Sequence, residues 1–91
     1  MLFELLAEFL GTFIFFFVIF TTLNPVYIGL TLGILVSIFS NTSGVNFNPA
    51  VTIASFYGGS LKKDFVIPYI ISQIAGGLLA VFIAKRVNLF K

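Results

Sequence analysis

The sequence predicts an all-α membrane protein with three transmembrane helices and one re-entrant half-helix. Two observations support this fold class. First, 59% of the 91 residues are hydrophobic and only 9% are charged, whereas an ordinary soluble domain has about 25% charged residues. Such a chain cannot cover its surface with polar groups, so a lipid bilayer suits it better than water. Second, long apolar runs alternate with short polar segments that carry helix start and stop signals.

The composition also excludes most kinds of catalytic and binding chemistry. There is no Cys, His or Trp, which excludes disulfides, thiol nucleophiles and histidine catalysis and leaves no typical zinc ligands. The carboxylates Glu4, Glu8 and Asp64 are too few and too scattered for a hydrolytic pair. The net charge is +2 without a run of basic residues. We therefore predict no enzyme activity, no cofactor, no metal and no nucleic-acid partner.

The first predicted span covers residues 5–23, and near its start it is interrupted only by Glu8 and Gly11. As a helix it reaches about 28 Å, enough to cross a hydrocarbon core of about 30 Å. A cleaved signal peptide needs a basic start and a cleavage site with small residues. The first four residues are apolar and acidic instead, so we expect a retained transmembrane helix.

The second predicted span covers residues 25–41. Asn24 suits the N-cap and Pro25 suits the first helical position. This helix reaches about 25 Å, which spans the core only if it stands nearly upright. The third predicted span covers residues 65–84 and reaches about 30 Å, with Pro68 in its first turn, where proline is tolerated.

Each predicted span also carries small residues four positions apart. In lipid, such stripes let helix backbones approach closely. One stripe could arise by chance, but three favour a tightly packed bundle. The stripes are Ala7/Gly11, Gly29/Gly33/Ser37 and Ser72/Gly76/Ala80/Ala84.

Residues 42–57 form the most informative segment, an irregular polar stretch followed by a short helix. Asn48 as N-cap, Pro49 in the first turn and glycines after Tyr57 delimit a helix of about 13 Å, half the thickness of a membrane. The segment either lies on the membrane surface or folds inward as a re-entrant loop. We favour the inward fold, because the short helix has no charged face that would hold it at the surface.

An inward fold places Asn48 near the middle of the bilayer. Its side-chain oxygen can cap the helix and its NH₂ group can donate into a cavity. The helix dipole adds about half a positive charge at the same point. This arrangement holds water or another neutral solute by its oxygen and repels cations and protons.

The block 43–52, which contains Asn48-Pro49-Ala50, resembles the first re-entrant loop of the aquaporin and glycerol-facilitator channels. The resemblance extends to block 7–12 in the first span and to Tyr69–Gln73 and Gly76 in the third. It implies that residues 1–91 form a single aquaporin-type repeat, the amino-terminal half of such a channel. By the same resemblance Glu8 braces the loop by accepting its N–H groups, while Gln73 can bond across helices.

The resemblance also implies which residues line the pore. They belong to the loop, to the start of the short helix and, by loop spacing, to the second span. In the family's second half an arginine usually follows Asn-Pro-Ala, and this chain has Val51 at that place. Asn46 stands where the family usually has a histidine, two residues before the motif. Without these cations we expect an apolar mouth that admits glycerol-sized solutes. The implied pore residues are Gly44, Val45, Asn46, Phe47, Asn48, Pro49, Ala50, Val51 and Ile28.

Three spans cannot enclose a pore, so we expect a partner. The simplest completion is a second copy in inverted orientation, as a homodimer or a higher oligomer. Lys62 and Lys63 fall on one side of the membrane and Lys85, Arg86 and Lys91 on the other. This small bias permits both orientations.

We therefore predict a multi-pass integral membrane protein whose partners are the lipid bilayer, the inverted copy and a small neutral solute. Its predicted function is a passive channel for water or small neutral solutes such as glycerol. The alternative is a non-conducting membrane interaction subunit, or a truncated half that pairs with another protein.

Overall fold

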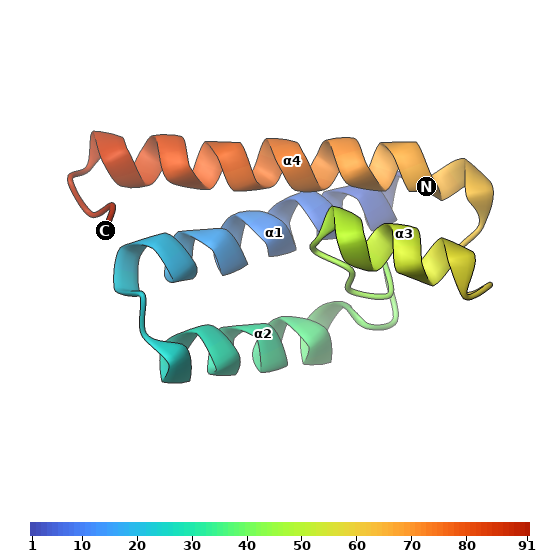
Figure 1. Ribbon diagram of the computed structural model, residues 1–91, viewed down its shortest axis with the longest axis horizontal. Helices are drawn as coiled ribbons and strands as arrows, with labels where there is room; N and C mark the ends of the chain where they lie inside the picture. Colours follow the sequence, from blue (N-terminus) through green and yellow to red (C-terminus); the bar gives the residue numbers. More distant parts are fainter.

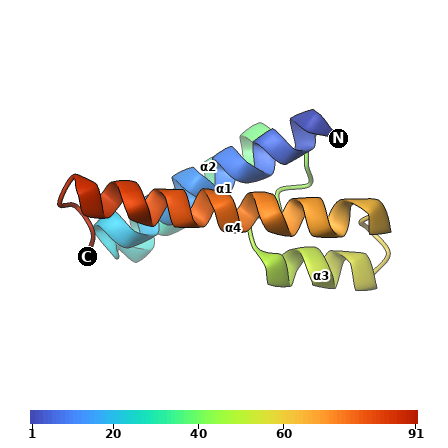
Figure 2. The same ribbon diagram turned by 90° about the horizontal axis from the view of Figure 1, so that it is seen from above.

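A computed structural model describes all 91 residues, and it is entirely helical (Figure 1). Helices α1 and α4 run in the same direction side by side, α2 packs against α1, and α3 packs against α4 (Figures 1 and 2). Helix α2 contacts neither α3 nor α4. The four helices are α1 (Leu2–Thr22), α2 (Pro25–Phe39), α3 (Pro49–Tyr57) and α4 (Lys63–Arg86).

Two of these helices are long and apolar enough to cross a membrane. They are α1, with 21 residues, and α4, with 24 residues, and an 18-residue stretch of each has a mean hydropathy of 2.2 and 2.0 respectively. Helix α2 is apolar but has only 15 residues. It ends at Phe39 and not at residue 41, because the N–H groups of Thr42 and Ser43 both bond to the Phe39 carbonyl and turn the chain away.

Helix α4 begins two residues earlier than the apolar pattern predicts. Because it starts at Lys63, Pro68 lies inside the helix and not in its first turn, so that expectation was wrong. The proline leaves one carbonyl, that of Asp64, without its helical N–H partner. Asp64 is exposed at the end of the helix, where solvent can satisfy that carbonyl.

Glycine allows the backbones of α1 and α4 to touch. A Cβ atom added at Gly76 would lie 2.5 Å from the Phe9 carbonyl oxygen and 3.2 Å from the Phe13 nitrogen. The stripe continues into Ala80 and Ala84, both completely buried. The glycine stripe of α2 behaves differently, because a Cβ added there would meet nothing within 4 Å. The predicted stripes of the first and third spans therefore pack within the chain, and that of α2 is left open.

Few side chains are buried within the chain. Only 14 of the 91 residues are buried, and large apolar side chains stay exposed along all four helices. An apolar exterior of this extent needs lipid or further protein to cover it. The helical, apolar architecture agrees in these respects with an aquaporin-type membrane fold.

A buried carboxylate and the loop before α3

Glu8 is the centre of the candidate site. Its side chain lies in α1 and is completely buried. Its two carboxylate oxygens accept hydrogen bonds from the backbone N–H groups of Phe47, at 2.8 Å, and Asn46, at 3.1 Å. The side-chain amide of Gln73, from α4, donates a third bond at 2.8 Å. Burial of a carboxylate without a cation is costly unless several donors satisfy it, and here three donors do so.

The network continues from Gln73 to α3. Its Nε2 atom also donates to the Thr52 hydroxyl oxygen at 2.7 Å, and the Asn46 side-chain amide donates to the same oxygen at 3.0 Å. Thr52 is completely buried. A single polar cluster therefore joins α1, α3, α4 and the loop, and fixes where the first turn of α3 lies.

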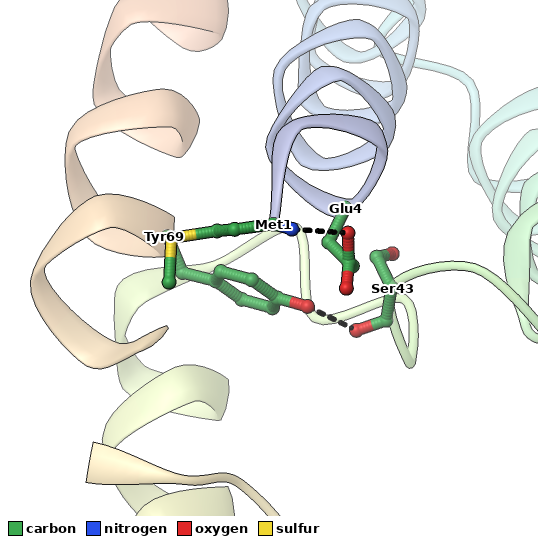
Figure 3. Close-up of polar contacts among 4 residues, drawn as sticks. All are labelled: Met1, Glu4, Ser43 and Tyr69. Carbon is green, nitrogen blue, oxygen red and sulfur yellow. Dashed lines mark hydrogen bonds and ion pairs between the residues drawn. The ribbon is translucent and has the colours of Figure 1, made fainter. Parts of the chain in front are cut away.

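Tyr69 fixes the other end of the loop. Its hydroxyl donates to the Ser43 carbonyl oxygen at 2.8 Å, from the second turn of α4 (Figure 3). The Ser43 hydroxyl accepts from the Val45 N–H at 3.2 Å. Beside this contact, the amino group of Met1 pairs with Glu4 at 3.4 Å (Figure 3). The loop is thus attached to α4 at its start and to Glu8 of α1 near its end.

The loop backbone adopts left-handed conformations at Gly44 (φ 81°), Val45 (φ 53°) and Phe47 (φ 57°). These are unfavourable for Val and Phe, so the surrounding bonds must hold them. The Phe47 side chain is buried against Gly11, where any Cβ atom would overlap its ring, and it meets the Phe39 ring edge-on at 6.4 Å. Phe47 can therefore present only its backbone to a solute.

Asn48 and the tip of α3 face outward from this network. The Asn48 side-chain oxygen accepts from the Ala50 N–H at 2.7 Å and caps the helix. Its NH₂ group makes no bond within the chain. Val51 is 43% exposed, and Ala50 is exposed as well.

An apolar groove continues from this tip along α1 and α4. It has a volume of about 360 Å³ and begins at Pro49. Apart from Pro49, its walls come from the middle and the second half of each long helix. The lining residues are Thr12, Phe16, Phe20, Pro49, Gln73, Ile74, Gly77, Leu78 and Val81.

The structure brings together most residues that the sequence predicts for the site. Glu8, Gln73 and the segment from Gly44 to Val51 form one continuous unit. Ile28 does not join it, because it lies in the first turn of α2, and α2 makes no contact with α3. No cluster of three or more His, Cys, Asp or Glu side chains that could hold a metal lies in the chain.

Two supporting residues, Thr52 and Tyr69, are not among those that the sequence predicts for the site. Thr52 carries a detectable signal, since it is one of few polar side chains in an apolar helix. Tyr69 begins the block of the third span that resembles the family, but the sequence does not identify the partner of its hydroxyl. Its partner, the Ser43 carbonyl, is fixed only by the tertiary fold.

The chain is similar in sequence to a family of known proteins. The profile of the family described as Major intrinsic protein matches residues 1–89. Aquaporin-8 of Notomys alexis is 48% identical over 60 residues, covering 66% of this chain and 23% of that protein. Aquaporin Z of Photorhabdus laumondii is 41% identical over 95 residues, covering 88% of this chain and 41% of that protein. Glycerol uptake facilitator protein-like 6 of Lactiplantibacillus plantarum is 38% identical over 84 residues, covering 82% and 39% respectively.

The chain thus spans less than half the length of these curated relatives. No solved structure matches it. The family profile nevertheless covers almost every residue, including the loop, the tip of α3 and the buried carboxylate. The chain therefore belongs to the major intrinsic protein family.

Proposed function

We propose that this chain forms half of a passive transmembrane channel for water and small neutral solutes such as glycerol. Its membership in the family, together with two apolar helices of sufficient length, makes it an integral membrane protein. The observation that carries the proposal is the tip of α3, where Asn48 caps a short helix that Glu8 and Thr52 hold in place. The relatives named aquaporins and glycerol uptake facilitator support the solute class.

In this proposal α1, α2 and α4 cross the membrane, and residues 42–57 enter it only halfway. The length of the helices supports this placement. Helix α4 is about 36 Å long, and Gln73, which bonds to Thr52 near the tip of α3, lies about 15 Å from its start. The tip of α3 therefore sits near the midpoint of α4. Helix α2 reaches about 22 Å and needs its flanking turns, or a thinner bilayer, to complete its crossing.

The loop supplies hydrogen-bond acceptors for the permeating solute. The N–H groups of Asn46 and Phe47 point to Glu8. In a planar trans peptide the carbonyl points opposite to the N–H of the same peptide unit. The carbonyls of Val45 and Asn46 therefore point away from Glu8, toward the open side of the loop, where they can accept hydrogen bonds from water or a hydroxyl group.

The tip of α3 supplies donors and a positive potential. The NH₂ group of Asn48 and the unpaired N–H group of Val51 in the first turn of α3 can bind the oxygen of a neutral solute. The helix dipole contributes about half a positive charge at this point. With two such tips at about 5 Å and an effective dielectric constant of about 20, a proton is repelled by roughly 3 kcal/mol.

The pore in this proposal is completed by an inverted second copy. Helix α3 covers only the first half of α4, and the apolar groove continues beyond Pro49 along the second half. Ile74 and Leu78 in this groove are 50% and 67% exposed. An inverted copy related by a two-fold axis would lay its own α3 in this groove, tip to tip with the first, and each copy would cover the other.

Osmotic swelling of vesicles that contain only this purified chain tests the channel. Two variants with the same local chemistry sharpen the experiment, because Asn24 and Asn48 are both N-caps followed by proline and both accept N–H bonds. Replacement of either by Ala costs about 1 kcal/mol of helix capping. We expect Asn48→Ala to reduce water and glycerol permeability toward that of empty vesicles, and Asn24→Ala to retain most of it.

Wild-type vesicles that swell no faster than empty ones would contradict the channel and favour the non-conducting interaction subunit. Equal losses in the two variants would remove Asn48 from the permeation path. Labelling of a tag on the carboxyl terminus tests the inverted pair separately. The pair requires that the tag be labelled from both sides of the membrane, and labelling from one side alone would exclude it.

A further inference from the structure

The carboxyl end of α4 carries a cluster of cations that the channel proposal does not use. Lys85, Arg86 and Lys91 are all exposed at this end. The carboxylate side chains all belong to the opposite end, because Glu4 and Glu8 lie in the first turns of α1 and Asp64 in the first turn of α4. Since α1 and α4 run in the same direction (Figure 1), no Asp or Glu side chain of the same copy lies near these cations.

The chain after α4 is folded into a defined hollow beside the cations. Asn88 adopts a left-handed conformation with φ 62°, and the N–H groups of Leu89 and Phe90 both bond to the Ala84 carbonyl. The Phe90 ring stacks on Phe20 at 5.5 Å. The hollow has a volume of about 290 Å³ and is lined by Lys85, Asn88 and Phe90.

This hollow combines a cation, an amide and an apolar wall. The Lys85 ammonium lies 6.0 Å from the centre of the Phe90 ring, and Asn88 can donate from its NH₂ group. One turn before Lys85 and on the same face of α4, Phe82 is 61% exposed. An exposed apolar side chain of α4 thus lies next to a shallow hollow that offers a cation and a hydrogen-bond donor.

We propose that this end of α4 binds the phosphate group of an anionic phospholipid. The lipid phosphate contacts Lys85 and Asn88, Arg86 and Lys91 add to the positive potential, and an acyl chain lies against Phe82. The proposal rests on the placement of α4 across the bilayer, because a helix of about 36 Å extends its last turn beyond a hydrocarbon core of about 30 Å into the headgroup layer. Anionic headgroups attract basic residues in that layer.

Native mass spectrometry of the purified chain in detergent tests the proposal with phosphatidylglycerol and phosphatidylcholine of identical acyl chains. We expect phosphatidylglycerol to bind more tightly, and Lys85→Gln to weaken its binding about fivefold, the effect of one cation near a lipid surface. Asn88→Ala should weaken it as well without a change of charge. The control is Lys62→Gln, which removes one cation from the opposite end, near Asp64.

Equal weakening by Lys62→Gln would overturn the proposal, because net charge and not the hollow would then govern binding. Equal affinity for the two lipids would overturn it too. Displacement of the lipid by inorganic phosphate at similar concentration would assign the hollow to a free anion instead. Circular dichroism checks that each variant remains helical, and Asn88→Ala provides a second test if Lys85→Gln does not fold. Water permeability is measured on the same variants, so loss of lipid binding with intact permeability is distinguished from failure of the channel.

Discussion

Glu8 is a completely buried carboxylate that no cation neutralises, and its charge is balanced only by N–H donors from Asn46, Phe47 and Gln73. Each donor comes from a residue 38 or more positions away in the chain. The carboxylate therefore holds the loop residues in their strained backbone conformations through long-range hydrogen bonds. The left-handed Phe47 is the clearest example, since its ring fills the space that Gly11 leaves open.

At this scale we predict that Glu8→Gln destabilises the chain. Gln replaces one acceptor oxygen by an NH₂ group, which then faces an N–H donor, and it removes the charge from the remaining bonds. Hydrogen bonds to charged groups contribute about 1.5–3 kcal/mol each, so we expect a loss of about 2 kcal/mol or more. Denaturant-induced unfolding in detergent micelles, followed by circular dichroism, measures this change.

Glu4→Gln is the matched control, because it removes the same charge one turn earlier, where Glu4 pairs only with the terminal amino group. The control should unfold at the same denaturant concentration as wild type. If Glu8→Gln also unfolds at the wild-type midpoint, the hydrogen bonds to the Glu8 carboxylate contribute nothing to stability.

At the scale of elements, the contact between α1 and α4 depends on the absence of side chains at Gly76 and Gly77. The glycines of α2 differ, because no other part of the same chain packs against them. Identical small-residue spacings thus serve close packing in one helix and remain free for an external neighbour in another.

We predict that Gly76→Ala separates α1 from α4, since the new methyl group would meet the Phe9 carbonyl, which is backbone and cannot rotate away. Overpacking of this kind costs about 1–3 kcal/mol. Gly29→Ala adds the same methyl group in open space, and it should be neutral or stabilising by up to about 1 kcal/mol. Unfolding midpoints of the two variants, compared in the same micelles, measure the difference. A smaller effect at Gly76 than at Gly29 would contradict the close packing.

At the scale of the whole molecule, the exposed apolar surface and the open groove beyond Pro49 favour assembly. The chain has no cysteine, so any introduced cysteine is unique. This property allows the geometry of the proposed inverted pair to be tested on a single helix.

We predict that Val51→Cys forms an oxidative cross-link between two copies, because the tips of both α3 helices meet in the inverted pair. Tyr57→Cys lies about 9 Å further along the same helix, and its side-chain position is 93% exposed. In an inverted pair the two Tyr57 positions point to opposite membrane faces, so this variant should stay monomeric on a denaturing gel. Cross-linking of Tyr57→Cys with none at Val51→Cys would indicate a parallel arrangement instead.

The helices themselves follow from local sequence. Asn24-Pro25 and Asn48-Pro49 start α2 and α3 where the sequence predicts, because capping and proline effects act within one turn. Local sequence predicts the other limits of these helices less accurately. Phe39 ends α2 early and Lys63 starts α4 early, because hydrogen bonds of the flanking loops, and not hydropathy, set these limits.

The composition and spacing of the sequence determined the apolar helical class, the short capped helix and the residues at its tip, because these depend on neighbours within a few positions. The resemblance predicted that Glu8 accepts N–H groups of the loop, and the structure identifies them as those of Asn46 and Phe47. Only the tertiary structure decided that the Tyr69 hydroxyl donates to the Ser43 carbonyl and that Thr52 accepts two amide donors. It also decided that the glycines of α4 pack against α1, while those of α2 contact no other part of the chain. The reason is physical: a buried polar group or an absent side chain acquires its role from whatever the fold brings within about 3–4 Å of it.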